Sequence, residues 1–138
     1  VVETAEGTFL YFSSNRGSGD QDIYVSRVDS DWTFGPATIV AELSTDFDDF
    51  MPNVSRNGLE IVLNSNRPGL DTFGGQDIYI AHRASTSDPW STPVNLGSNV
   101  NTLGNETSAS LSGDGARLHF GRDGDIFVST RTKVSGQP

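Results

Sequence analysis

The segment Gly58-Leu-Glu-Ile-Val-Leu-Asn-Ser-Asn-Arg67 occurs three times in this chain, with variations. The first copy is Gly7-Thr-Phe-Leu-Tyr-Phe-Ser-Ser-Asn-Arg16, and the third is the shorter Gly115-Ala-Arg-Leu-His-Phe-Gly-Arg122. In each copy a glycine, typical of a tight turn, is followed by an apolar run rich in β-branched and aromatic residues. The segment therefore predicts one strand that is used three times.

Other segments repeat in the same order around this strand, so the whole chain is built from one unit. Blocks that read Asp-Ile-Tyr or Asp-Ile-Phe begin at Asp22, Asp77 and Asp125, and blocks with Trp and Pro follow the first two at 32–36 and 90–93. No long stretch keeps the 3.6-residue apolar period of a helix. The unit predicts an all-β chain made of four-stranded antiparallel sheets of about 50 residues, the size of a β-propeller blade.

Three such blades are expected, at 1–47, 48–104 and 105–138. Their expected strands lie at 1–4, 8–15, 21–28 and 36–43, at 51–55, 59–66, 76–83 and 90–96, and at 107–112, 116–121 and 125–131. The residues after Arg131 contain no Trp–Pro block, so we expect the third blade to lack its last strand.

Three blades cannot close a ring, because closed propellers have about 4–8 blades. We therefore expect two chains to assemble as a homodimer into one six-bladed ring. The alternative is that the chain is part of a longer protein whose other blades lie elsewhere. Because the first residue is Val1 rather than Met, we also expect a processed chain, with any signal peptide upstream.

The composition excludes some classes of protein. The 138 residues contain 9 Lys and Arg against 18 Asp and Glu, which gives a formal net charge of −9. Such a surface repels phosphate, so we expect neither nucleic-acid binding nor adhesion to anionic lipid. Cysteine is absent, and no apolar run approaches the roughly 20 residues that span a bilayer. The length fits a single acidic domain.

The repeat resembles the TolB-like β-propeller family. The matching elements are the turn Ser-Arg-Asn-Gly58, the loop Ser-Asn-Arg67-Pro-Gly, and the segments Gly75-Gln-Asp77-Ile-Tyr-Ile and Pro89-Trp90-Ser-Thr-Pro-Val-Asn-Leu-Gly97. The resemblance covers nearly the whole chain. It implies a bacterial protein, periplasmic or secreted, that acts by protein binding, and it implies no catalytic residue.

An arginine and an aspartate flank the loop between the second and third strands of every repeat. The pairs are Arg16 with Asp22, Arg67 with Asp77, and Arg122 with Asp125. Such residues face each other across an antiparallel pair, so we expect charge-assisted hydrogen bonds that hold the loop. Anion binding by the arginines is the alternative, although a ligand site would be expected to differ between repeats.

Carboxylates gather in the loops that join one repeat to the next, at Asp46, Asp48, Asp49 and Glu106. Asp49 and Glu106 have the same position in their repeats, so we expect them to accept hydrogen bonds from backbone amides where blades adjoin. In the alternative, these carboxylates are the acids of a carbohydrate-active enzyme or lectin, with a tryptophan or Phe73 stacking on sugar.

The histidines and tryptophans have simpler interpretations. His119 aligns with Tyr11 and Val62 and is expected to pack inside a blade, and His82 ends a strand, so we expect neither a metal site nor a catalytic triad. Trp32 and Trp90 align with each other, and we expect both to pack at the edge of a fourth strand.

Alternation of strand direction gathers the long, polar loops at one end of the propeller, where loops carry function on a rigid scaffold. Phe47, Phe50 and Phe73 are the expected apolar anchors, since aromatic and arginine residues dominate interface energetics. The candidate binding residues are Arg16, Asp46, Phe47, Asp48, Asp49, Phe50, Arg67, Phe73, Asn101, Asn105 and Glu106. We expect a non-enzymatic scaffold for protein or peptide, without a cofactor.

Overall fold

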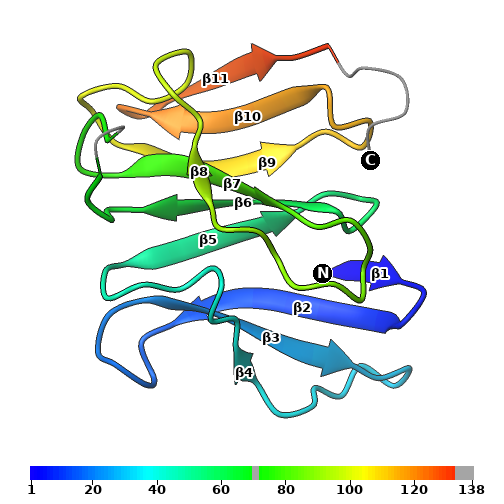
Figure 1. Ribbon diagram of the computed structural model, residues 1–138. Coiled ribbons are helices and arrows are strands. Elements are labelled where there is room, and N and C mark those ends of the chain that lie inside the picture. Colours follow the sequence, from blue (N-terminus) through cyan, green and yellow to red (C-terminus); the bar gives the residue numbers. More distant parts are fainter. Residues whose placement is uncertain (70–71, 133–138) are drawn as a thin grey trace.

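The computed structural model describes residues 1–69 and 72–132, and this part of the chain is all-β, without a helix. Its strands form three antiparallel sheets that follow one another along the sequence (Figure 1). The prediction of an all-β chain is confirmed. Two stretches lie outside the described residues: 70–71 in the loop that follows Arg67, and 133–138 at the end of the third expected blade. No described helix could cross a membrane.

Each sheet corresponds to one repeat of the sequence, and its strands pair in chain order. Sheet one contains β1 (Val2–Thr4), β2 (Gly7–Ser14), β3 (Asp22–Val28) and β4 (Thr38–Ile39). Sheet two contains β5 (Asp49–Val54), β6 (Glu60–Ser65), β7 (Asp77–His82) and β8 (Val94–Asn95). Sheet three contains β9 (Glu106–Leu111), β10 (Arg117–Arg122) and β11 (Asp125–Thr130). The first three strands of each repeat lie within two residues of their predicted positions.

The fourth strands are much shorter than predicted. Strands were expected at 36–43 and 90–96, but β4 and β8 have two residues each. Pro36 and Pro93 precede these strands and have no N–H to extend the hydrogen-bond ladder. After β4 the Leu43 N–H donates to the Val40 carbonyl at 3.0 Å, so the chain turns away from the sheet.

The two tryptophans have different surroundings, and the position of Trp90 corresponds to Phe34 in sheet one rather than to Trp32, since Ser91 and Gly35 donate to equivalent carbonyls of β7 and β3. Trp90 is 6% exposed and lies in the core between sheets one and two, where its ring meets the Tyr11 ring edge-on at 6.1 Å. Trp32 is 70% exposed and has a positive φ of 63° in the loop after β3. The prediction of edge packing is therefore wrong for Trp32, because the turn that holds it projects into solvent.

The hairpin between β10 and β11 is as tight as predicted. Arg122 pairs with Asp125 in the ladder, so only Asp123 and Gly124 form the loop. Their φ angles are 52° and 89°. Two successive positive φ angles are typical of the type I′ turn, whose twist matches that of the strands.

Two strands carry the same irregularity at equivalent positions. Met51 in β5 and Ser108 in β9 have φ angles of 52° and 54°, and each stands where the pairing with the next strand shifts register. Left-handed backbone costs an L-residue roughly 1 kcal/mol. The two irregularities meet, since the Ser108 hydroxyl lies 3.4 Å from the Met51 sulfur.

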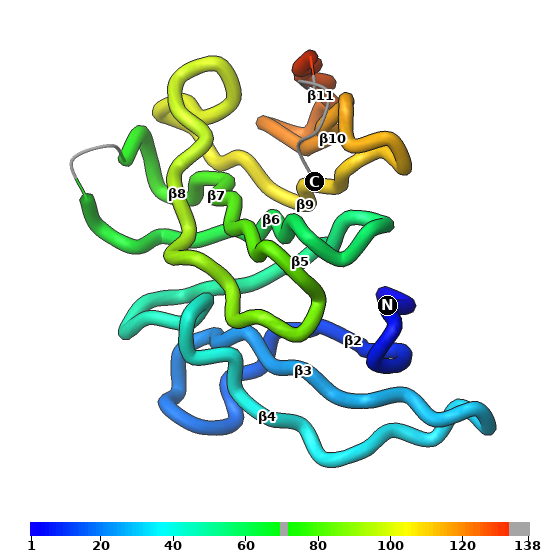
Figure 2. The backbone as a smooth tube through the Cα atoms, turned by 45° about the vertical axis from the view of Figure 1, so that its right-hand side comes forward, coloured from blue at the N-terminus to red at the C-terminus, as the bar shows by residue number. Residues whose placement is uncertain are grey.

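The three sheets follow one another in the backbone view of Figure 2, and apolar cores fill the spaces between successive sheets. The core between sheets one and two is formed by Ile23, Val40, Leu43, Ile61, Leu63, Tyr79, Ala81 and Trp90. The core between sheets two and three is formed by Val62, Ile78, Ile80, Val100, Ala109, Leu118 and Phe120. Sheet two is therefore apolar on both faces, which explains why every residue of β6 is buried.

The outer face of sheet three is uncovered. Ile126 and Val128 are 83% and 55% exposed, whereas the corresponding Ile78 and Ile80 of sheet two are buried in the second core. His119 pairs with Val128 and is exposed with it. The prediction that His119 packs inside a blade is wrong, because no further sheet of the described residues covers this face.

Candidate functional site

The loops that follow β2, β4, β6 and β8 gather at one end of the sheets, which we call the loop end (left in Figure 1). Backbone hydrogen bonds join loops of neighbouring sheets there. The Asp49 N–H donates to the Gln21 carbonyl at 2.7 Å, and the Glu106 N–H donates to the Gln76 carbonyl at 3.0 Å. The structure thus brings together the loops that the strand topology predicted to meet.

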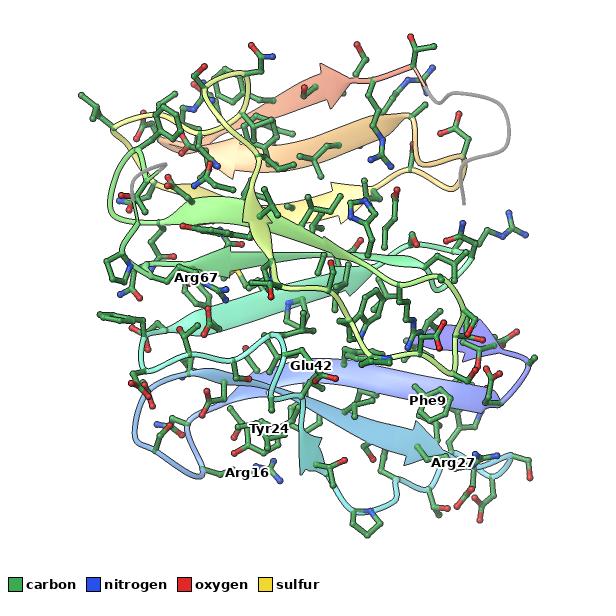
Figure 3. The ribbon with its side chains drawn as sticks, in the orientation of Figure 1. Phe9, Arg16, Tyr24, Arg27, Glu42 and Arg67 are labelled. Atoms are coloured by element: carbon green, nitrogen blue, oxygen red, sulfur yellow. The ribbon has the colours of Figure 1, made fainter. Side chains whose placement is uncertain are left out.

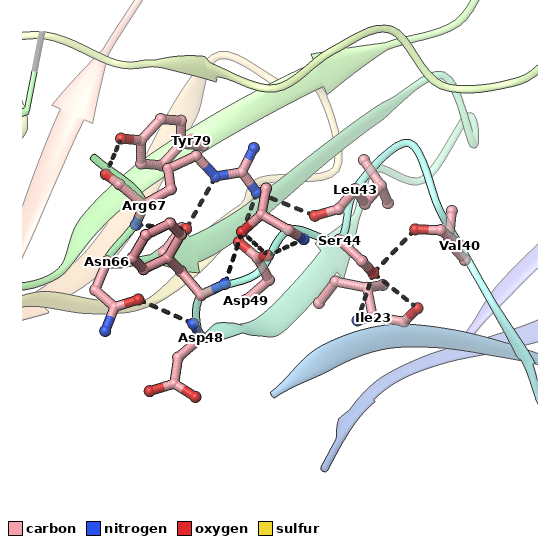
Figure 4. A network of polar contacts seen from close by, with 12 residues as sticks. Ile23, Val40, Leu43, Ser44, Asp48, Asp49, Asn66, Arg67 and Tyr79 are labelled. Carbon is pink, nitrogen blue, oxygen red and sulfur yellow. Dashed lines mark hydrogen bonds and ion pairs between the residues drawn. The ribbon is translucent and has the colours of Figure 1, made fainter. Parts of the chain in front are cut away.

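Arg67 is the centre of a buried polar network at this end (Figure 4). Its Nη2 lies 2.5 Å from Oδ1 of Asp49, the first residue of β5, and 3.0 Å from the Leu43 carbonyl. Its Nε donates to the Ser65 hydroxyl at 2.9 Å, and its guanidinium lies 4.9 Å from the centre of the Tyr79 ring. The Asp49 side chain has no exposed area. The pair therefore ties the loop before β5 to the end of β6.

Sheet three contains the same arrangement. Arg122 Nε lies 2.7 Å from Oε1 of Glu106, the first residue of β9, and its Nη2 donates to the Val100 carbonyl at 2.5 Å. The guanidinium lies 4.6 Å from the centre of the Phe127 ring. We call these two networks, Arg67 with Asp49 and Arg122 with Glu106, the arginine clamps.

The predicted pairing of the arginines with the first aspartate of the next strand is wrong, because the structure shows other hydrogen-bond partners for these aspartates. Asp77 Oδ2 accepts hydrogen bonds from the Phe73 N–H at 2.8 Å and from Asn95 Nδ2 at 2.9 Å, rather than from Arg67. Asp22 accepts from a serine hydroxyl at 2.8 Å, and Asp125 pairs with Arg122 only through the backbone register. Asp22 and Asp77 begin their strands and accept hydrogen bonds from the loops before them, whereas Arg67 and Arg122 reach the first residues of β5 and β9.

A threonine completes each clamp, four residues before the acid. The Thr45 N–H and hydroxyl both lie 2.7 Å from Asp49 Oδ2. The Thr102 N–H donates to Glu106 Oε2 at 2.9 Å, and its hydroxyl donates to Oε1 at 2.5 Å. The prediction that Asp49 and Glu106 accept backbone amide hydrogen bonds between repeats is confirmed.

These contacts determine the protonation of Glu106. Burial raises the pKa of its carboxyl, but hydrogen bonds from Thr102 and the Arg122 guanidinium lower the pKa by more, so it lies below its ordinary value. A carboxyl that stays ionised has no proton to donate as a general acid. The Asp49 carboxylate has the equivalent hydrogen-bond partners, Thr45 and Arg67.

Two other candidate residues also form bonds within the chain. Asn101 is 1% exposed, and its side chain accepts from the Ile78 N–H at 2.8 Å and donates to the Ile78 carbonyl at 2.9 Å. Asp48 Oδ1 accepts from the Gln21 N–H at 3.0 Å. Asn105 is exposed and forms an isolated parallel bridge with Gln76.

The tips of the loops remain accessible. Asp46 is exposed, Phe47 is 42% exposed, and Phe50 and Phe73 are half-buried. Leu103, which aligns with Asp46 in the repeat, is 92% exposed and was not among the predicted residues. The sequence indicates this residue only by contrast, because Leu103 is apolar where the previous repeat has the charged Asp46.

Arg16 is the counterpart of Arg67 in sheet one, and it is exposed. Its Nε donates to the Ser14 hydroxyl at 3.1 Å, and its guanidinium lies 5.3 Å and 5.1 Å from the ring centres of Phe12 and Tyr24 (Figure 3). It forms no ion pair with a carboxylate of the described residues. Arg16 is thus a cation that is oriented by two aromatic rings and open to solvent.

The sequence reasoning missed a second set of arginines, at the opposite end of the sheets. Arg83 Nε donates to the Gly58 carbonyl at 2.7 Å, and Arg131 Nε donates to the Gly115 carbonyl at 2.8 Å. Arg27 reaches the same turn of sheet one and donates to the carbonyl before Gly7 at 2.9 Å. The sequence does contain a pattern that indicates this set, because each block that begins Asp-Ile-Tyr or Asp-Ile-Phe ends with an arginine.

The described residues contain no group of three His, Asp or Glu side chains that could hold a metal ion. No protein-family model matches this chain, and no curated protein matches it. Equivalent positions in the three repeats of the chain can still be compared with one another.

Proposed function

We propose that this chain is a non-enzymatic scaffold that binds a protein or peptide at the loop end. One observation supports the proposal above the others: Arg67 and Arg122 are paired with Asp49 and Glu106, while the loop tips carry exposed apolar side chains. Phe47, which follows the exposed Asp46 in the chain, is 42% exposed, and Leu103 in the loop after β8 is 92% exposed. Exposed apolar residues with a polar surround are typical of interaction sites.

The chemistry of these tips favours a partner segment that combines apolar and basic residues. The chain has a formal net charge of −9, and the loop-end arginines Arg67 and Arg122 are already paired. A basic segment would be attracted by this surface at long range and then bury Phe47 and Leu103. The alternative of a glycosidase loses two of its four candidate acids, because Asp49 and Glu106 are held by arginine.

Binding to an array of random 12-residue peptides tests the proposal. Three proteins are compared: the wild type, Trp32→Ser and the double variant Phe47→Ser/Leu103→Ser. We expect the wild type and Trp32→Ser to select the same peptides, rich in Lys or Arg and apolar residues. We expect the Phe47→Ser/Leu103→Ser double variant to lose them. Trp32 is the matched control, since its side chain is also exposed but lies away from the loop end. Selected peptides that tolerate the double variant, or an array without selection, would contradict the proposal.

We further propose that the three sheets are blades of a TolB-like propeller. The repeat, the antiparallel order of strands and the apolar cores between sheets support this arrangement. The outer face of sheet one carries Leu10 and Phe12, the counterparts of Ile61 and Leu63 in the first core. A bacterial periplasmic or secreted setting remains an expectation from the resemblance.

Two chains can then associate by placing sheet three of one on sheet one of the other. The faces that would meet, with Ile126 and Val128 on one side and Leu10 and Phe12 on the other, repeat the chemistry of the contacts between sheets within the chain. Light scattering after gel filtration should give a mass near twice 14.8 kDa for the wild type. It should give a monomer for Val128→Asp. A wild-type monomer at micromolar concentration would contradict the homodimer.

A further inference from the structure

The loops that join sheets one and two carry two neighbouring carboxylates at the loop end, Asp20 and Asp48. The Asp48 Oδ1 atom accepts a hydrogen bond from the Gln21 N–H at 3.0 Å, so this carboxylate lies at the peptide group that links Asp20 to Gln21. Figure 4 shows the Asp48 carboxylate directed away from the clamp of Arg67. Neither acid forms an ion pair with a cation of the described residues. Oδ1 of Asp20 is enclosed and has no hydrogen-bond partner among them.

The loops that join sheets two and three make the same connection without these charges. Gly75 and Asn105 occupy the positions that correspond to Asp20 and Asp48. Asn105 Oδ1 lies 2.7 Å from the place that a Cβ of Gly75 would occupy, so side chains at these two positions face each other. The equivalent backbone hydrogen bond joins the loops in both places, at 2.7 Å and 3.0 Å. The connection between sheets therefore does not require two carboxylates.

The pair of acids has an energetic cost that the fold does not offset. Two carboxylates at facing positions repel each other, and an enclosed carboxylate oxygen without a donor loses its hydration. A bound cation would remove both costs. Because the pair occurs at one connection and not at the next, it has the asymmetry that is expected of a binding site rather than of a repeated structural contact.

The surroundings of the pair favour a guanidinium as this cation. Phe47 directly precedes Asp48 in the chain, and its ring is 42% exposed. In both arginine clamps a guanidinium contacts a carboxylate and an aromatic ring, with 4.9 Å and 4.6 Å between its central carbon and the ring centre. A guanidinium is planar, stacks on aromatic rings and donates several hydrogen bonds in a fixed geometry, whereas an ammonium is a compact and strongly hydrated charge.

We propose that Asp20 and Asp48 form an arginine subsite of the loop end, in which a guanidinium of the partner segment bonds to both carboxylates and packs against the Phe47 ring. This inference rests on the peptide binding proposed above, and it names the basic residue that the partner contributes. The guanidinium supplies donors to carboxylate oxygens and neutralises the repulsion between the two acids. The subsite also sets the orientation of the segment, since its arginine binds beside Phe47 and not beside Leu103.

The double variant Asp20→Gly/Asp48→Asn tests the subsite, because it introduces the residues that the connection between sheets two and three already contains. On the array of random 12-residue peptides, we expect the wild type to select arginine over lysine. The variant should lose this preference and retain the preference for apolar residues. Asp88→Asn/Asp114→Asn is the matched control, because it changes the net charge equally at two exposed acids of the opposite end. The control should select as the wild type does, and circular dichroism checks that each variant is folded.

Fluorescence anisotropy with one selected peptide isolates the charged contact. Replacement of its arginine by citrulline, which is neutral and similar in shape, should weaken binding to the wild type at least about tenfold, because charge-assisted hydrogen bonds are lost. The same replacement should leave binding to Asp20→Gly/Asp48→Asn unchanged.

The outcomes separate this proposal from the proposed function. Equal effects of citrulline on the two proteins, or equal selection of lysine and arginine, would overturn the arginine subsite alone if Phe47→Ser/Leu103→Ser still abolishes binding. An array without selection would overturn both proposals. Calorimetric binding of calcium ions at micromolar concentration that is lost in Asp20→Gly/Asp48→Asn would assign the two acids to a metal ion and would overturn the subsite too.

Discussion

Arg67 and Asp49 form a 2.5 Å ion pair in which the carboxylate has no exposed area, although the two residues are 18 positions apart in the sequence. The pair lies where the loop after sheet one enters sheet two, and Thr45 and Leu43 extend it into that loop. It stabilises one connection between sheets, and Arg122 with Glu106 stabilises the next.

Arg67→Ala should lower the free energy of unfolding by about 3 kcal/mol, because it leaves the buried Asp49 carboxylate without its cation. Urea denaturation measures the change. Arg16→Ala is the matched control, since Arg16 has the same position in sheet one but contacts Ser14 and two aromatic rings in place of a carboxylate. It should cost less than about 1 kcal/mol. Equal losses for the two variants would contradict a structural role of the ion pair.

A double-mutant cycle should identify the true partner of Arg67. Arg67→Ala combined with Asp49→Ala should show a coupling energy of about 1.5 kcal/mol or more, as expected for a charge-assisted hydrogen bond. The cycle of Arg67 with Asp77 should show less than about 0.5 kcal/mol, because Asp77 bonds to Phe73 and Asn95 instead. The reverse order of the two couplings would restore the pairing expected from the sequence.

Acid should weaken the clamp of sheet three. The hydrogen bonds from Thr102 and Arg122 lower the pKa of Glu106 below the 4.5 of an unperturbed glutamate, so its ionised form is favoured in the folded state. The resulting stability is fully present above the unfolded pKa and is lost as the pH falls through the lower, folded pKa. The melting temperature of the wild type should therefore exceed that of Glu106→Gln at pH 7. The difference should shrink as the pH falls below 4.5. A difference independent of pH would contradict this.

Met51→Gly should raise the free energy of unfolding by roughly 1 kcal/mol, because glycine adopts the φ of 52° without the cost that a side chain carries. Met51→Ala is the control and should not stabilise, since alanine retains the Cβ. Met51 is 44% exposed, so little apolar contact is lost in either variant. Thermal melts compare the two. A glycine variant that melts below the alanine variant would show that the left-handed backbone is not strained.

Trp90→Ala should destabilise the chain by about 3–5 kcal/mol, as expected for removal of a large side chain from a core. Trp32→Ala should change stability by less than about 0.5 kcal/mol, because its side chain is 70% exposed. Chemical denaturation followed by circular dichroism measures both. Similar effects of the two variants would contradict the different surroundings of the two tryptophans.

Sequence alone determined the local part of this protein. The positions of the first three strands in each repeat, the Asp123-Gly124 hairpin and the gathering of the loops at one end all followed from apolar runs and turn residues. These signals are local, because strand propensity and turn chemistry depend on a few neighbouring residues. The strand signals recur in all three repeats, whereas the Asp123-Gly124 turn occurs only in the third.

Tertiary structure alone decided which side chains meet. The sequence placed Arg67 near Asp77, but the backbone of sheet two carries Asp49 to the other side of β6, where its carboxylate is buried against the guanidinium. In the same way, Trp90 is buried by sheet one, while Trp32 lies in a turn that projects into solvent. Ion pairing and burial depend on the distance between segments far apart in the chain, and only the packing of the sheets fixes that distance.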